Sequence, residues 1–232
     1  MLLQRWVGET FAQLYVTDCR AALFAALAQH RRSRARGADA RWMTLLINDM
    51  AALRNYALRG TVRLWTSATA AGAAAAWAAN TLPQLRLSLI PLAIGAALVA
   101  LLARPLTSAI AAQRKERGRL NRFLVRRVHA ELTGEPGGGG HGFRKLETLS
   151  DDLSRAAVRR AGHAGAMEAV ATLAGLAAAL ILALVWQASG QPGHAGLAGS
   201  LTLLGFIAAR LLESARALHA RIGGRIALDR LQ

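Results

Sequence analysis

The chain has 232 residues, 53% of them hydrophobic, and its 29 Lys and Arg against 13 Asp and Glu give a formal net charge of +16. The apolar half excludes a disordered protein, and the single cysteine, Cys19, excludes a disulfide scaffold. Two classes remain: a basic protein that binds nucleic acid, and a membrane protein whose positive charge lies on one side.

Helix-forming residues dominate the chain, and no sustained alternation of apolar and polar residues indicates a strand. Breaks rich in Gly and Pro divide it into an N-terminal helix and four helices of roughly 40 residues. A 40-residue helix is about 60 Å long, about twice the hydrocarbon core of a bilayer. We therefore expect an all-α fold, an integral membrane bundle of about four long helices that extend into the cytoplasm. The expected helices lie near residues 2–29, 39–80, 84–132, 144–188 and 195–230.

Long stretches without a charged residue predict where these helices cross the membrane. Residues 64–85 and 87–103 are two such stretches, and a third, 169–209, is interrupted by the Gly- and Pro-rich residues 187–196. Alanine supplies much of the apolar character of the first stretch, and alanine-rich runs also form soluble helices. The last span requires Arg210 to extend toward the interface. The predicted spans are about 64–85, 87–103, 168–187 and 195–212.

The basic residues are distributed as the positive-inside rule demands. If the four spans alternate in direction, 28 of the 29 lie on one side, and Arg86 alone lies in an outside link. A soluble nucleic-acid binder has no reason to show this alternation, so we expect membrane lipids and no nucleic acid among the partners. Both termini should be cytoplasmic, as should loops at about 29–38 and 130–142. The excess of Arg over Lys favours a GC-rich bacterial source, hence a multi-pass protein of the bacterial inner membrane.

No enzyme motif is recognisable in the sequence. The glycine-rich residues 134–142 lack the Gly-Lys-Ser/Thr ending of a phosphate-binding loop, since Phe143 and Arg144 follow. The six histidines form no pair at helical spacing, and one Cys cannot build a metal cage. We therefore expect no catalytic, cofactor-binding or metal-binding residue in this chain, and no enzymatic activity of its own.

Three ionisable residues are candidates for polar pairing within the bundle. Glu168 lies at the inner edge of the third predicted span, where it could be a functional intramembrane carboxylate. Pairing with a nearby Arg at the interface is the interpretation we favour. Asp49 and Arg54 lie where the first long helix nears the membrane, and we expect them to pair within the bundle.

Four segments carry a resemblance to a known family. They read YVTDCRAALF at 15–24, LLINDMAALR at 45–54, ELTG at 131–134 followed by FRKLE at 143–147, and RIALDRL at 225–231. In this order they resemble the transmembrane domain of type I ABC exporters, from the inner end of its second span to the end of its sixth. The chain would then lack the first one to two spans and the ATPase domain.

The resemblance implies a mechanism and partners. Family members pair two six-span halves around one pathway, and the fourth and fifth spans cross to the opposite half. Short coupling helices in the cytoplasmic loops dock on ATPase domains, which hold ATP and magnesium. Here they would lie near residues 29–36 and 130–141. The implied contacts are Gln29, His30, Arg31, Arg32, Glu131, Leu132, Thr133 and Gly134.

The sequence therefore favours a membrane-spanning subunit or fragment of an ATP-driven ABC-type exporter. Its partners would be an ABC ATPase domain and a second transmembrane half, identical or different. One alternative is a structural or signalling membrane bundle that binds a cytoplasmic partner through its helical extensions. Another is a soluble, basic helical protein that binds nucleic acid, whose affinity would depend steeply on salt.

Overall fold

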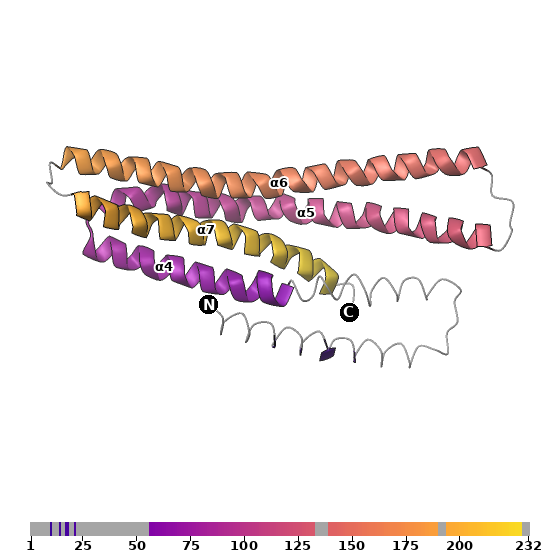
Figure 1. Ribbon diagram of the computed structural model, residues 1–232, viewed down its shortest axis with the longest axis horizontal. Coiled ribbons are helices and arrows are strands. Elements are labelled where there is room, and N and C mark those ends of the chain that lie inside the picture. Colours follow the sequence, from indigo (N-terminus) through magenta and orange to yellow (C-terminus); the bar gives the residue numbers. More distant parts are fainter. Residues whose placement is uncertain are drawn as a thin grey trace.

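A computed structural model describes residues 56–132, 139–189 and 194–228, together with five isolated helical positions between Thr10 and Ala21. Its elements are a π-helix, η2 (Tyr56–Val62), followed by α4 (Arg63–Thr81), α5 (Leu85–Leu132), α6 (Gly139–Ala188) and α7 (His194–Leu228) (Figure 1). Over these residues the chain contains no strand, so the all-α prediction is confirmed there.

The boundaries of α5, α6 and α7 follow the Gly and Pro breaks closely, with one clear difference. The predicted helix at 2–29 and the start of the one at 39–80 lie outside the described ranges. The predicted helix at 144–188 begins earlier, at Gly139, so part of the glycine run is helical. A glycine weakens a helix by only about 1 kcal/mol relative to alanine. Gly142 also lies close to α5, since a Cβ there would be 3.6 Å from the guanidinium carbon of Arg127. The neighbouring helix can therefore support this turn.

The two long central helices differ in their backbone hydrogen bonding. α5 contains Pro91 and Pro105 in its interior, whereas the sequence of α6 has no proline. A proline inside a helix removes one backbone N–H donor and crowds the carbonyl four residues earlier. Thr107, which follows Pro105, donates its hydroxyl to the Ala103 carbonyl at 2.9 Å. α5 therefore has two weakened positions and α6 has none of this kind.

The four α-helices run alternately up and down, but consecutive helices do not all pack together. Residues 82–84 join α4 to α5, yet the two helices make few contacts and diverge (Figure 1). α4 packs on α7 instead, α5 packs along α6, and α7 also contacts both α5 and α6. The bundle thus consists of two antiparallel pairs, α4 with α7 and α5 with α6, with α7 as the element common to both.

Small residues let the helices approach closely where they cross. A Cβ built on Gly95 of α5 would lie 2.5 Å from the Cβ of Ala174 in α6. A Cβ on Gly175 would lie 2.9 Å from the Cβ of Ala208 in α7. Close backbone approach through small residues is typical of helices packed in membranes. The buried core forms two clusters along this seam, whose members are Leu85, Leu92, Ala174, Ala178, Leu182, Leu204 and Ile207, and Val99, Leu106, Ile110, Met167, Ala171 and Ala215.

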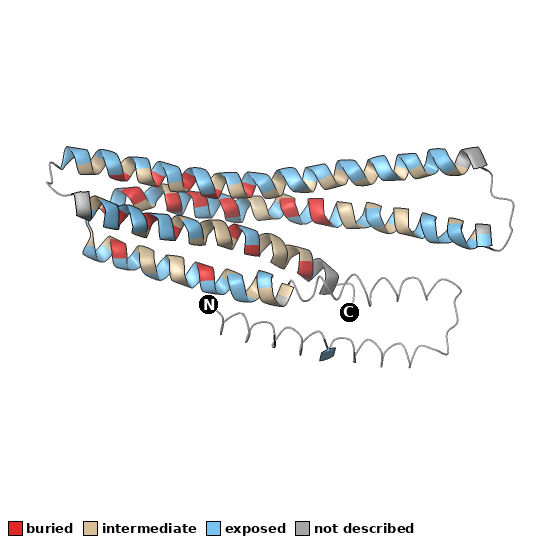
Figure 2. Cartoon of the chain, viewed as in Figure 1, coloured by how far each residue is buried: buried red, intermediate tan, exposed pale blue. Residues whose placement is uncertain are grey.

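Three helices are long and apolar enough to cross a membrane, at Leu85–Ala130, Gly142–Ala188 and Gly196–Arg225. α4, which was expected to be a fourth span, is not among them because its Thr, Ser, Trp and Asn residues dilute its apolar character. Figure 2 shows that exposed residues recur along α5 and α6. The exposed leucines and isoleucines among them form one stripe on α5 and another on α6. These stripes are the surface expected to face lipid. They consist of Leu87, Ile90, Ile94, Leu98 and Leu101, and of Leu173, Leu176, Leu180 and Leu184.

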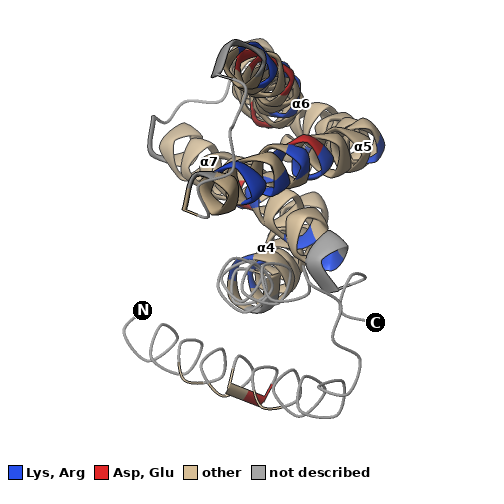
Figure 3. Ribbon diagram, turned by 90° about the vertical axis from the view of Figure 1, so that its right-hand side faces the viewer, with Lys and Arg blue, Asp and Glu red and all other residues tan. Residues whose placement is uncertain are grey.

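Beyond these stripes, α5 and α6 continue together past the ends of α4 and α7 (Figure 1). From Arg104 to Leu132, α5 extends about 40 Å at 1.5 Å per residue. Seen from this end of the molecule, Lys and Arg line α5, α6 and α7 (Figure 3). The start of α5, the end of α6 and the start of α7 lie at the opposite end (Figure 1). The structure thus separates an end rich in Lys and Arg from the end where α5 and α7 begin.

Candidate functional site

The residues expected to contact an ATPase domain lie mostly outside the described part of the chain. This applies to Gln29, His30, Arg31, Arg32, Thr133 and Gly134, and also to the pairing candidates Asp49 and Arg54. Glu131 and Leu132 are the last two residues of α5, and Leu132 is 81% exposed. These two residues therefore lie at the tip of the α5–α6 hairpin.

The hairpin tip carries apolar side chains that nothing in the described structure covers. Val125 and Val128 of α5 and Phe143 of α6 are exposed, as is Leu132. They lie among arginines on the part of the hairpin that extends beyond the lipid-facing stripes. Exposed apolar side chains in such a charged setting are typical of a contact surface for another protein.

Glu168 is paired, as the interface interpretation expects. Arg216 of α7 donates to its carboxylate at 3.0 Å, and both side chains are partly exposed. The pair joins α6 just before its apolar stretch to α7 just after its own apolar stretch. An exposed pair of this kind contributes at most about 1 kcal/mol to stability. Because the carboxylate of Glu168 is already paired, its role here is a contact between two helices.

A second acidic group, not singled out by the sequence, joins α4 to α7. The carboxylate of Glu213 accepts hydrogen bonds from Arg63 Nε at 2.8 Å and from Ser67 Oγ at 3.1 Å. Arg210 also donates to it, and its guanidinium lies 5.1 Å from the Phe206 ring centroid. Arg210, which the span prediction directed toward the interface, is therefore held inside this cluster of Arg63, Ser67, Arg210 and Glu213. The i, i+3 spacing of Arg210 and Glu213 was the local signal available in the sequence.

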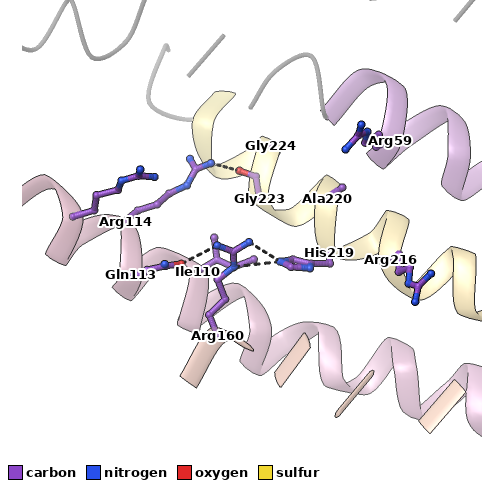
Figure 4. A pocket seen from close by; sticks show the side chains of 11 residues that line it. Arg59, Ile110, Gln113, Arg114, Arg160, Arg216, His219, Ala220, Gly223 and Gly224 are labelled. Atoms are coloured by element: carbon purple, nitrogen blue, oxygen red, sulfur yellow. Dashed lines mark hydrogen bonds between the residues drawn. The ribbon is translucent and has the colours of Figure 1, made fainter. Parts of the chain in front are cut away.

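A polar cavity of about 350 Å³ lies between η2, α5, α6 and α7. We call it the basic pocket. Five arginines, one histidine and one glutamine supply its polar side chains (Figure 4). The described residues that line it are Arg59, Ile110, Gln113, Arg114, Arg117, Arg160, Arg216, His219, Ala220, Gly223 and Gly224.

Arg160 of α6 is fixed at the centre of the basic pocket by neutral partners. Its Nη1 donates to Gln113 Oε1 at 3.0 Å, while Nε and Nη2 lie 3.3 and 3.1 Å from Nε2 of His219 (Figure 4). A guanidinium can only donate, so His219 Nε2 must accept. The ring is therefore neutral and carries its proton on Nδ1. Nearby, Arg114 donates to the Gly223 carbonyl at 2.6 Å.

Glycines shape the wall of the pocket where η2 meets α7. A Cβ on Gly60 would lie 2.7 Å from Arg221 Cα, and a Cβ on Gly224 would lie 2.1 Å from Tyr56 Cβ. Neither position has room for a side chain. This close approach brings Arg59 to the pocket from η2, opposite the residues of α5 and α6.

The chemistry of these side chains is that of anion binding. The part of the lining that the structure describes contains no carboxylate, and the nearest one named above, Glu168, is engaged with Arg216. Arginine stays protonated at any physiological pH and offers paired N–H donors to carboxylate or phosphate oxygens. Among the described residues, no group of three His, Cys, Asp or Glu is placed to hold a metal ion.

Sequence reasoning missed the basic pocket because its residues come from four separate elements. Gln113 and Arg117 share a face at i, i+4, as do Arg216 and His219 at i, i+3. Such spacings are common along any basic helix. The convergence of these faces on Arg160 is set by tertiary packing.

Comparison with known proteins adds no family to this description. The chain matches no protein-family model, and no curated protein sequence is detectably similar to it. The inference of function therefore rests on the residues and geometry described above.

Proposed function

We propose that this chain is a membrane-spanning part of an ATP-driven exporter of the ABC type, which forms a translocation pathway and couples to a separate ATPase domain. The observation that carries the proposal is the α5–α6 hairpin. It extends about 40 Å beyond the last lipid-facing residues and exposes Leu132 and Phe143 at its tip. A coupling element has to reach a cytoplasmic ATPase in this way.

The divergence of α4 from α5 supports the same proposal. An exporter half exchanges two consecutive helices with its partner, which requires them to separate from the helix before them. Here α5 leaves α4 immediately after residues 82–84 and packs with α6. An apolar groove of about 440 Å³ opens between α4 and α5, with Ile207, Leu211 and Leu218 of α7 at its floor. Such a groove can accept a helix from a second transmembrane half.

The charge distribution supports the membrane orientation that coupling needs. With the turn at residues 82–84 outside, the 18 basic residues that follow Arg86 face the cytoplasm, and the ten before residue 64 join them if α4 also crosses beside α7. The hairpin tip then lies on the side where ATP is available. The substrate pathway would lie between the two halves, within the bacterial inner membrane.

Copurification from membranes tests the proposal. The tagged chain is solubilised in a mild detergent, and the purified material is assayed for Mg-ATP hydrolysis and for polypeptides that react with a photoactivatable ATP analogue. We expect an ATP-labelled polypeptide to copurify, and we expect the double substitution Leu132→Asp, Phe143→Asp to remove it. Val158→Asp is the matched control, because Val158 is equally exposed on α6 but is remote from the tip.

Two outcomes would contradict the proposal in different ways. A chain that stays in the membrane but copurifies with no ATP-binding polypeptide would favour the structural or signalling bundle. A chain that high salt alone releases from membranes would favour the soluble nucleic-acid binder.

A further inference from the structure

We infer that the basic pocket is a binding site for a compact soluble anion of the phosphate class, such as inorganic phosphate or a small phosphomonoester. Nothing in the proposed exporter function requires this site. The inference rests on the fixed donors of Arg160, the number of arginines that line the pocket, and its depth relative to the membrane in the proposed orientation.

The donors of the basic pocket are arranged before any ligand arrives. Hydrogen bonds to Gln113 and His219 hold the Arg160 side chain and engage Nη1, Nη2 and Nε. A guanidinium has five N–H donors, so one hydrogen on each Nη remains for a ligand. Such a fork matches two oxygens of a phosphate. Because the partners of Arg160 are neutral, its full positive charge is still available to an anion.

The charge around the pocket also favours an anion. Arg59, Arg114, Arg117, Arg160 and Arg216 line a cavity of about 350 Å³, a size that suits a small ligand. Within the described lining, Arg216 has a carboxylate partner, Glu168, at the pocket edge. Like charges gathered in one cavity repel each other, and an anion carrying two charges relieves this repulsion.

The depth of the pocket separates a soluble anion from a lipid headgroup. Glu168 and Arg210 mark the ends of the charge-free stretches of α6 and α7. Arg160 lies eight residues before Glu168, and His219 lies nine residues after Arg210. These separations are about 12 and 14 Å along the helices. The headgroup layer of one leaflet is only about 5–8 Å thick. The pocket therefore lies on the cytoplasmic side of that layer, where dissolved anions reach it directly.

Calorimetric titration of the whole chain tests the inference. The protein is placed in nanodiscs of zwitterionic lipid, at constant ionic strength, and titrated with inorganic phosphate. We expect saturable binding that Arg160→Gln weakens by at least about tenfold, since hydrogen bonds between charged groups are the strong ones. Arg155→Gln is the matched control: it removes the same charge from α6, but Arg155 pairs with Asp152 outside the pocket. Its affinity should equal that of the unmodified protein.

A second variant guards against misfolding. Arg117 is exposed on α5 and lines the pocket, so Arg117→Gln should weaken binding while leaving the thermal unfolding temperature unchanged. A third arm replaces phosphate with nanodiscs that contain phosphatidic acid. The inference is overturned if phosphate gives no saturable heat, if Arg160→Gln and Arg117→Gln bind as Arg155→Gln does, or if only the anionic lipid binds.

Discussion

Glu213 is a single acidic side chain that joins α4 to α7. It accepts hydrogen bonds from Arg63 and Ser67 of α4 and from Arg210 of its own helix. Ser67 is buried, so its hydroxyl depends on this carboxylate for a partner. Removing the negative charge would leave two guanidiniums beside each other without a counterion.

We therefore expect Glu213→Gln to destabilise the protein by about 1–2 kcal/mol, because a partly buried charge network loses its centre. Thermal unfolding in detergent, followed by far-ultraviolet circular dichroism, measures the effect. Glu116→Gln is the control, since the Glu116–Arg119 pair joins neighbouring turns of one helix and contributes only about 0.2–0.5 kcal/mol. Equal losses for the two variants would contradict a special role for Glu213.

Residue pairs could be predicted from the sequence only where both partners share a helix. Glu116 and Arg119 have the i, i+3 spacing that a helix brings together, and they form an ion pair. The position of Glu168 at the start of an apolar stretch indicated a need for a partner, but not that Arg216 supplies it. Arg63 and Glu213 are separated by 150 positions in the chain. Contacts at that separation follow from which helices pack, and spacing carries no information about them.

At the scale of the element, the closest approach between α5 and α6 occurs at Gly95. The Cβ of any other residue there would lie about 2.5 Å from the Cβ of Ala174, well inside normal contact. Gly118, on the same helix, has nothing within 4 Å of a built Cβ. The packing at Gly95 therefore requires a residue without a side chain, whereas the packing at Gly118 does not.

The same substitution should consequently have opposite effects at these two sites. Gly95→Ala should destabilise the protein by about 1–3 kcal/mol, because α5 must move away from α6. Gly118→Ala should stabilise it by up to about 1 kcal/mol, because alanine is the better helix former and meets no neighbour. Chemical denaturation of the two variants in the same detergent compares them. A stabilising Gly95→Ala would mean that α5 and α6 do not cross at this residue.

Most helices could be predicted because their ends carry strong local signals. Residues 82–84 contain a proline, and the residues before His194 contain Gly and Pro, so the starts of α5 and α7 were foreseen closely. The predicted start of α6, residue 144, is five residues later than the observed start, because glycines favour a helix end but do not require one. The π-helical turn of η2 could not be predicted, since it adjoins two close contacts with α7, of Gly60 with Arg221 and of Tyr56 with Gly224.

At the scale of the whole molecule, the order of charged and apolar stretches predicts which end faces the cytoplasm. The link between α4 and α5 holds Pro83 and Gln84 and is followed by Arg86, whereas the other basic residues of the described helices lie toward the hairpin end. Opposite ends of the bundle should therefore be accessible from opposite sides of the membrane.

Cysteine labelling checks this orientation. In a Cys19→Ser background, a cysteine replacing Gln84 should react with a membrane-impermeant maleimide in intact spheroplasts. A cysteine replacing Phe143 should react only after the membrane is permeabilised. Both side chains are accessible at the ends of helices, so a difference in rate reports the side of the membrane. Equal labelling of both sites in intact cells would contradict the orientation.

The packing of the helices against each other was not contained in their order. Charge alternation gave an up-and-down bundle, in which neighbours along the chain usually pack as neighbours in space. The structure instead separates α4 from α5 and pairs α4 with α7. That choice depends on matched surfaces such as Gly175 against Ala208 and on the Glu213 cluster, which join residues far apart in the sequence.

The two prolines of α5 make the two arms of the hairpin differ in stiffness. α6 is a helix of 50 residues without a proline, whereas α5 has a weakened position at Pro105, next to the core residues Leu106 and Ile110. The arm from Pro105 to Leu132 is about 40 Å long. A bend of about 10° at Pro105 would displace the tip by about 7 Å, somewhat more than half the diameter of a helix with its side chains. A small change in the angle of α5 at Pro105 would thus become a larger displacement at the tip of the hairpin.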